Sequence, residues 1–336
     1  MFNVSWVEKF RPKKLNEIIS QEEIVSSLKD VIKKKNIPHL LFFGPSGCGK
    51  TSTILALARE LFGDKFWEGR VIELNASDER GIKVVRDKIK KYAKNAVKLN
   101  DNIPPWKIII LDEADNMTSD SQFALRKIME DYSKVTRFCI ICNYHHKIIE
   151  TIVSRCSMFR FRPIPIKEIK NKLLSICQQE NIHCSKKNIG KIIKISRGDL
   201  RKAVNLLQKC KRNKNFISTD KKVKSIDSIN EELIDEISGI IPIDKLRNFI
   251  LYCINVDIEK VETAINNFNN DAYSLTNQID TIANLIIKDT EISNKLSNNT
   301  ISLIIQKLVE IDQHLIKGCD EYIQFYRLGY YIMSLM

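Results

Sequence analysis

The sequence lacks any apolar stretch close to the ~18 residues that a membrane-spanning helix requires, and no signal-peptide core follows Met1. It also lacks an even cysteine framework, because its nine cysteines are odd in number and most lie inside apolar segments, as in a reducing compartment. No internal repeat is present. These absences exclude membrane, secreted and disulfide-scaffold classes and leave a soluble intracellular globular protein as the expectation.

Glycine is also scarce, at 11 of 336 residues, about half the usual ~7%. This scarcity excludes a collagen-like chain. Three of the eleven nevertheless fall within six positions, at Gly44, Gly47 and Gly49. Such a cluster in a glycine-poor chain marks this stretch as the first place to look for a site.

Charge is unevenly distributed along the chain. Residues 231–336 carry 8 basic and 16 acidic side chains, whereas residues 1–230 carry 46 basic and 25 acidic ones, an excess of 21 positive charges. The basic part indicates a polyanionic partner and the acidic part a different task. At roughly 150 residues per domain, 336 residues predict two or three domains.

The glycine cluster lies between a predicted strand and a predicted helix. Residues 39–43 (HLLFF) are apolar, residues 44–51 (GPSGCGKT) match GxxxxGK[ST], and apolar residues at helical spacing follow from Ile54. Glycines let successive backbone N–H groups turn toward a phosphate at a helix N-terminus. We expect Lys50 to reach the β and γ phosphates and the Thr51 hydroxyl to ligate Mg²⁺. The motif predicts nucleotide binding without specifying the reaction.

Two further apolar segments end in polar residues. Residues 107–111 (KIIIL) precede Asp112, which we assign to the metal, and Glu113, which we assign to the attacking water. The alternative is that these acids only cap a helix beginning near Thr118. Residues 137–142 precede Asn143, whose amide is a candidate for contact with the γ-phosphate or the same water. The CxxC within this segment is interpreted as core, since no second Cys or His pair stands at metal spacing.

The coarse pattern of the first 161 residues is an alternation of strands and helices, which predicts a parallel α/β sheet. The candidate strands are 39–43, 71–74, 107–111, 137–142 and 158–162. Pro163 and Pro165 mark a boundary, after which residues 166–210 show helical spacing. A polar stretch at 211–230 suits a linker, and from residue 231 the chain is helical again, with an apolar stripe at Ile301, Ile304, Leu308, Ile311 and Leu315.

Seven segments, in their order along the chain, resemble the small subunits of replication factor C, the eukaryotic AAA+ sliding-clamp loader. Their residues are most similar to the subunit 4 type, which is called subunit 2 in yeast. The segments are WVEKFRP (6–12), GPSGCGKT (44–51), LNASDERGI (74–82), LDEAD (111–115), ICNY (141–144), SRC (154–156) and GDLRKAVN (198–205). The resemblance implies an AAA+ P-loop sheet with helices on both faces (1–162), a helical lid (163–212), a linker (213–230) and a helical collar for oligomerisation (231–336).

The resemblance also implies roles for individual residues. Arg155 is similar to the arginine finger that enters the ATP site of the adjacent subunit, Arg201 to the second sensor of the subunit's own nucleotide, and Val7 and Arg11 to the segment near the adenine. Cys48, at a variable position of the loop, is expected to make ATP binding sensitive to thiol reagents. The expected nucleotide contacts are therefore Val7, Arg11, Gly44, Pro45, Ser46, Gly47, Cys48, Gly49, Lys50, Thr51, Ser52, Asn143 and Arg201.

The partners implied are the other subunits of a nuclear hetero-pentamer, the clamp PCNA and a primed DNA junction, with ATP and Mg²⁺ as cofactors and no membrane. Residues 80–98 carry eight basic side chains and one acid. A charge cluster of this kind is usually only a solvated face, but the resemblance favours phosphate contacts at Arg80 and Arg86, with Lys83 and Lys90 on the same outer helix face. The far end of this helix, around Tyr92, is the expected clamp contact.

Three other functions are compatible with parts of this sequence. A DEAD-box RNA helicase is excluded because a second motor domain would need more chain and the residues after 165 show no second α/β pattern. A subunit that binds ATP structurally, or only donates an arginine finger, is disfavoured by the intact Lys50, Thr51, Asp112 and Glu113. A subunit shared with a checkpoint or other variant loader remains open.

Overall fold

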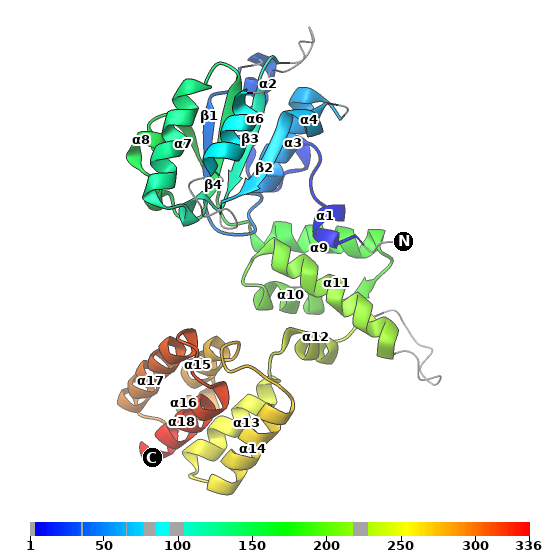
Figure 1. The fold of residues 1–336 in the computed structure, drawn as a ribbon. Helices are drawn as coiled ribbons and strands as arrows, with labels where there is room; N and C mark the ends of the chain where they lie inside the picture. The colour runs from blue at the N-terminus through cyan, green and yellow to red at the C-terminus, as the bar shows by residue number, and fades with distance from the viewer. Residues whose placement is uncertain (1–3, 35, 65, 77–84, 95–103, 218–227) are drawn as a thin grey trace. The chain divides into compact units, whose positions relative to one another are not determined.

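The computed structural model describes residues 4–34, 36–64, 66–76, 85–94, 104–217 and 228–336. The chain divides into two compact units, one of residues 1–182 and 189–208 and one of residues 183–188 and 209–336 (Figure 1). In the described ranges, every helix is too short or too polar to cross a membrane.

Five parallel strands form the sheet of the first unit, in the order β2-β3-β4-β1-β5. Their apolar sequences match a sheet whose two faces are both buried. The strand near residue 158 begins two residues earlier than expected, because it pairs with β1 in register from His39↔Cys156 to Phe43↔Arg160. The predicted parallel α/β sheet is confirmed. Its strands are β1 (His39–Phe43), β2 (Val71–Asn75), β3 (Lys107–Asp112), β4 (Thr136–Cys142) and β5 (Cys156–Arg160).

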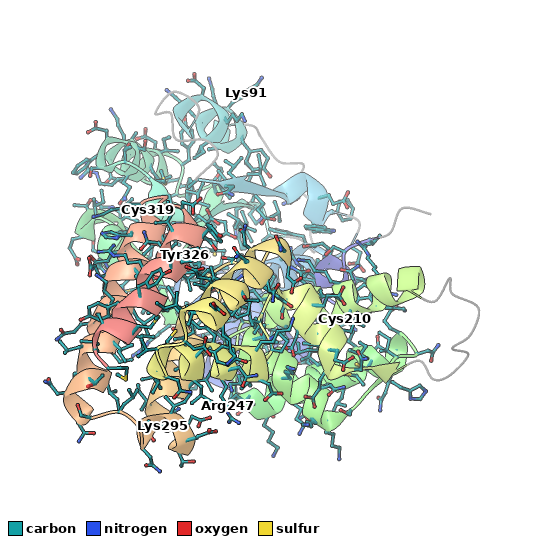
Figure 2. The ribbon with its side chains drawn as sticks, turned by 90° about the horizontal axis from the view of Figure 1, so that it is seen from below. Lys91, Cys210, Arg247, Lys295, Cys319 and Tyr326 are labelled. Atoms are coloured by element: carbon teal, nitrogen blue, oxygen red, sulfur yellow. The ribbon has the colours of Figure 1, made fainter. Side chains whose placement is uncertain are left out.

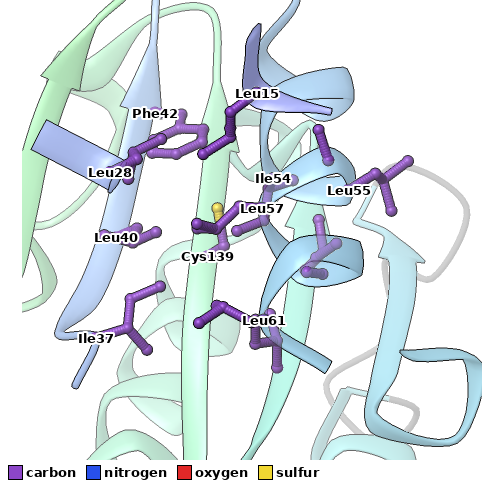
Figure 3. Packing of buried hydrophobic residues seen from close by; sticks show 14 of the residues in the cluster. Leu15, Leu28, Ile37, Leu40, Phe42, Ile54, Leu55, Leu57, Leu61 and Cys139 are labelled. Carbon is purple, nitrogen blue, oxygen red and sulfur yellow. The ribbon is translucent and has the colours of Figure 1, made fainter. Parts of the chain in front are cut away.

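Helices cover both faces of this sheet. Leu40 and Phe42 of β1 pack with Ile54 and Leu57 of α3 (Lys50–Phe62) and with α2 (Glu22–Lys34), as Figure 3 shows. Leu41, which points to the opposite face, packs in a second cluster with α7 (Ser119–Asp131) and α8 (Glu150–Val153). The period-two alternation of one strand therefore supplies two cores.

Short elements complete this part of the chain. They are α1 (Trp6–Lys9), α4 (Trp67–Arg70), three 3₁₀ turns, η1 (Leu15–Glu17), η3 (Ala114–Asn116) and η4 (His145–Lys147), and, in the basic segment, η2 (Val85–Ile89) followed by α6 (Lys90–Lys94). The turn η2 is π-helical. Its wider winding shifts the face on which later side chains lie, so the spacing of one regular α-helix does not apply across residues 85–94.

The next segment is helical, as expected, in α9 (Ile166–Gln179), α10 (Lys186–Ile195) and α11 (Leu200–Ile217). Two features were not predicted. A two-residue strand, β6 (His183–Cys184), pairs in parallel with β7 (Ser228–Ile229). In addition, α11 continues to Ile217, into the segment interpreted as a linker. The four-part domain division stays a prediction.

The second unit is a helical bundle around one apolar core. Ile304, Leu308 and Ile311 are buried as the stripe predicts, and Ile301 and Leu315 are partly buried against the same core. The helices are α12 (Glu231–Ser238), α13 (Ile243–Ile254), α14 (Ile258–Asn270), α15 (Ile279–Lys288), α16 (Thr290–Ser293), α17 (Asn298–Ile316) and α18 (Glu321–Ser334).

Candidate nucleotide-binding site

The glycine-rich loop connects β1 to α3 at the carboxyl edge of the sheet. Gly44 has φ +146°, and a Cβ there would lie 2.3 Å from the carbonyl oxygen of Phe161, so only glycine allows the loop to leave β1 this close to the end of β5. Helix α3 begins after Gly49, and no side chain caps its first N–H groups. Those groups and the positive end of the helix dipole form a site for an anion.

Lys50 lies almost fully buried within this loop. Its ammonium donates to the carbonyl oxygens of Gly44 and Pro45, both at 2.8 Å, and to Oδ1 of Asn143 at 3.0 Å. All three acceptors are neutral, so they orient the ammonium without compensating its charge. The side chain also joins the loop to the end of β4, as the sequence pattern predicts for two neighbouring strand ends.

Thr51 and Asp112 form the second contact between strand ends. The Thr51 hydroxyl donates to Oδ2 of Asp112 at 2.7 Å, and Oδ1 of Asp112 accepts the backbone N–H of Glu113 at 2.9 Å. A hydroxyl and a carboxylate are the hard oxygen ligands that Mg²⁺ prefers. The donor set at this edge therefore fits Mg²⁺.

Glu113 is held in an unusual backbone conformation. Its φ of 54° and ψ of 38° lie in the left-handed region, which non-glycine residues adopt rarely and which is common at functional sites. The conformation ends β3 abruptly and leaves the side chain exposed at the cleft. The Glu113 carboxylate is thereby available to a water molecule, which agrees with its predicted role.

Asp115 is a residue of the site that the sequence interpretation left without a role. Its Oδ2 accepts the backbone N–H groups of Asn143 and Tyr144 at 3.3 and 3.4 Å. The carboxylate thus fixes the position of Asn143 from the neighbouring strand end. Its place in the acidic run after β3 was the available signal, but the run itself does not say which strand end Asp115 faces.

One cleft contains most of the predicted nucleotide contacts. Apolar residues of its lining, including Val7, Phe10, Ile176 and Val204, come from the N-terminal segment and the lid and suit a planar base. Phe10, Ile176 and Val204 were not predicted. Gly44 and Pro45 lie at the start of the loop and contact Lys50. The predicted residues that line the cleft are Val7, Arg11, Ser46, Gly47, Cys48, Gly49, Lys50, Thr51, Ser52, Asp112, Glu113, Asn143 and Arg201.

The surroundings of Cys48 do not favour the reactivity expected from its position in the loop. Its side chain is 3% exposed and its thiol donates to the carbonyl oxygen of Pro45 at 2.9 Å. Burial raises the pKa of the thiol, and the nearby Lys50 opposes this only in part. A shielded, protonated thiol is a poor nucleophile, which weighs against the expected sensitivity to thiol reagents.

Arg155 lies outside this cleft. Its guanidinium makes an ion pair with Glu130 of α7 at 2.6 Å and donates to the carbonyl oxygen of Thr151, also at 2.6 Å. The side chain remains 38% exposed. Two anchors leave the other N–H groups of the guanidinium free to reach outward, which is compatible with action on another molecule.

Some of the predicted DNA contacts lie outside the described residues. Arg80 and Lys83 fall outside the described residues, and Arg86 belongs to the turn η2 but its side chain is outside them too. Lys90 is exposed, as are Lys91 and Lys94 of the same helix, and Figure 2 shows Lys91 at the outer edge of α6. The described part of this segment therefore presents lysines on an exposed face.

Family comparisons agree with this architecture along the chain. The model for "ATPase family associated with various cellular activities (AAA)" matches residues 40–164, an "RCF1/5-like, AAA+ ATPase lid domain" matches residues 171–212, and a "Replication factor C C-terminal domain" matches residues 241–329. Together with the phosphate loop between β1 and α3 and the acidic pair after β3, these matches define an AAA+ ATPase.

Full-length similarity narrows this class. Human replication factor C subunit 4 is 43% identical over 335 residues, covering 98% of this chain and 88% of that protein. Subunit 2 of Saccharomyces cerevisiae is 39% identical over 330 residues, covering 96% and 91%. The small subunit of Archaeoglobus fulgidus is 53% identical over 203 residues, covering 60% and 62%. The chain belongs to the replication factor C family, as one of its small subunits.

Among solved structures, the Holliday junction branch migration motor RuvB of Thermotoga maritima has a similar fold. The TM-score is 0.53 at 17% identity, covering 74% of this chain and 80% of that one. At this identity the likeness concerns the fold alone.

Proposed function

We propose that this chain is an ATPase subunit of the clamp loader that opens PCNA and loads it onto primed DNA, for replication and repair synthesis in the nucleus. It acts within a hetero-pentamer of replication factor C subunits. The observation that carries the proposal is the convergence of Lys50, Thr51, Asp112 and Glu113 on one cleft, in a chain of this family.

Binding of the triphosphate uses groups that are already oriented. The free N–H groups at the start of α3 donate to phosphate oxygens, and Lys50 exchanges a backbone carbonyl for a phosphate oxygen while keeping its charge. Thr51 and Asp112 would hold Mg²⁺, which would neutralise charge on the β- and γ-phosphates. The apolar part of the cleft lining takes the base.

Hydrolysis depends on the residues that follow β3 and β4. The Glu113 carboxylate orients the attacking water and polarises its O–H bond, so that the water oxygen attacks the γ-phosphorus and ADP leaves. Asn143, held by Asp115, contacts the γ-phosphate or the same water. Arg201 contacts the nucleotide from the lid.

Arg155 acts in the site of the neighbouring subunit, where its guanidinium neutralises charge that develops on the transferred phosphoryl group. Its exposed position outside its own cleft supports this role. Arg80, Lys83, Arg86 and Lys90 contact the phosphates of the template strand, which position the protein without reading sequence. DNA and clamp binding then stimulate hydrolysis by aligning neighbouring subunits with one another.

Two other functions stay open. A subunit that binds ATP without turnover needs no water-orienting acid, so the placement of Glu113 favours turnover. Membership of a variant loader with a different large subunit is compatible with the same site. Mass spectrometry of proteins that co-purify with the tagged chain identifies which assemblies contain it.

The test is Glu113→Gln in the reconstituted complex, followed by single-turnover hydrolysis and by PCNA loading on primed circular DNA. We expect hydrolysis at this site to fall by about 100-fold or more while ATP binding and clamp opening persist. Glu232→Gln, an exposed acid of α12 that does not line the cleft, is the matched control. An unchanged ATPase rate in the Glu113 variant would show that this site is not hydrolytic.

A further inference from the structure

The phosphate loop contacts the lid through a hydrogen bond between two side chains. The hydroxyl of Ser46 donates to Oδ2 of Asp199 at 3.0 Å, although 153 positions separate the two residues. The other carboxylate oxygen of Asp199 accepts the backbone N–H of Lys202 at 3.1 Å. Asp199 therefore caps the start of α11, which ties its carboxylate to the first turn of that helix.

Gly47 shows how closely the loop fits this carboxylate. A Cβ at residue 47 would lie 2.1 Å from Oδ1 of Asp199, and the φ of +69° at this position is one that side chains disfavour. Glycine at 47 thus serves the approach of the lid as well as the turn of the loop. The loop therefore approaches the first turn of α11 closely at residue 47.

Arg201 lies in the same first turn of α11, two residues after Asp199, and lines the cleft together with Ser46 and Lys50. A shift of this turn relative to the loop would therefore move the Arg201 guanidinium relative to the phosphates. The Asp199 carboxylate also has an electrostatic effect on the loop, since it contributes to the raised pKa of the Cys48 thiol.

We propose that Ser46 and Asp199 form a clasp that holds the start of α11 against the phosphate loop and so sets Arg201 at the γ-phosphate. Asp199 is a positioning residue, because it acts through Arg201 and touches none of the reacting atoms. The inference rests on the proposed roles of the loop and of Arg201. The clasp discriminates nucleoside triphosphates from diphosphates, since a guanidinium at the γ position has no partner in ADP.

The test compares ATP and ADP affinities of the full chain by calorimetry in the presence of Mg²⁺. Ser46→Ala removes the donor, and we expect it to weaken ATP binding roughly 3- to 10-fold while ADP binding changes less than about 2-fold. Ser46→Thr keeps the hydroxyl and should restore most of the lost ATP affinity. Thermal unfolding of each variant shows whether the fold is kept.

A second arm uses Arg201→Ala alone and combined with Ser46→Ala. If the clasp acts through Arg201, the double variant binds ATP no more weakly than Arg201→Ala. Equal weakening of ATP and ADP by Ser46→Ala, or full additivity with Arg201→Ala, would overturn the clasp while leaving the role of Arg201 intact. If Arg201→Ala itself does not reduce the preference for ATP, the proposed role of Arg201 fails and the clasp fails with it.

Discussion

Most helices of the bundle have an N-terminus capped by a side chain, whereas the helix that follows the phosphate loop does not. In the unit that contains residues 209–336, five helices begin with a side chain that accepts a backbone N–H, from Asn230, Asp257, Asp289, Ser297 and Asp320. In the other unit, α3 begins after Gly49 with no such side chain. A capped helix end is structurally complete, whereas an uncapped one leaves N–H groups for a ligand. Capped helices also occur in the first unit, at α7 by Thr118 and at α11 by Asp199, and α13 and α15 of the bundle have no side-chain cap. What sets α3 apart is the combination of an uncapped N-terminus with the glycine-rich loop before it.

Buried polar groups show the same contrast. Gln278 of the bundle is fully buried, donates to the carbonyl oxygens of Gly239 and Ser274, and accepts the N–H of Ile241. Each of its bonds fixes a turn. Lys50 makes as many bonds, but its ammonium keeps an uncompensated charge that a phosphate can use. Polar groups such as Gln278, whose hydrogen bonds are all made, stabilise the bundle. Lys50 can instead exchange its hydrogen-bond acceptors for phosphate oxygens in the cleft.

The largest expected effect concerns the independence of the two units. Phe249 is fully buried, with ring centroids 5.8 Å from Phe268 and 6.5 Å from Phe325, so Phe249→Ala should reduce the free energy of unfolding of the bundle by about 3–5 kcal/mol. ATP affinity should stay within about 2-fold of wild type. Chemical denaturation and ATP titration measure the two quantities. The exposed Ile323→Ala is the control, and a parallel loss of ATP affinity would contradict the separation.

The next-largest effect is expected from removing the ammonium group of Lys50. Lys50→Met should weaken ATP binding roughly 100-fold or more, because it removes charge-assisted hydrogen bonds to the phosphates. Lys307→Met, which breaks an ion pair with Glu310 at 2.8 Å in the bundle, should leave ATP binding unchanged. Equilibrium titration with a fluorescent ATP analogue compares them. Equal ATP affinities of the two variants would contradict the proposed difference between the two units.

A smaller effect is expected from the anchor of the proposed arginine finger. Glu130→Gln keeps the shape of the side chain but removes the charge that holds Arg155 at 2.6 Å, so turnover at the neighbouring site should fall roughly 10-fold. Arg155→Ala should cost more, and the two changes together no more than Arg155→Ala alone. Steady-state ATPase of the assembled complex reports all three. A loss in Arg155→Ala without any loss in Glu130→Gln would show that the anchor is dispensable.

The effect that is smallest near neutral pH is a pH dependence of the stability of the sheet. His39 of β1 accepts the backbone N–H of Phe138 at 3.1 Å, and burial, helped by Arg137, lowers its pKa from 6.5 to about 4. The unfolded chain therefore takes up a proton that the folded chain refuses, and the free energy of unfolding falls as pH drops from 6.5 toward 4. His39→Gln should flatten this decline in denaturation curves, whereas the exposed His146→Gln should not. An equal pH slope in both variants would assign the decline to other groups.

The sequence predicted this sheet well and its cross-contacts poorly, for a physical reason. Strands such as 39–43 are short apolar runs followed by polar residues, so their existence and parallel order follow from local pattern. The role of Asp115, the anchor at Glu130 and the Ser46–Asp199 contact join residues 28, 25 and 153 positions apart, and no local spacing encodes their orientation. The burial of Cys48 could not be predicted for the same reason, since it depends on tertiary packing.

The most direct measurement is the ATPase rate of the purified chain alone, set beside the rate at the same site in the assembled complex. Since an arginine finger is worth ~10³–10⁵ in rate in P-loop nucleotide hydrolases, the isolated chain should bind ATP yet hydrolyse it at least about 100-fold more slowly than the complex. A monomer that turns over ATP at the full rate of the complex would contradict the account.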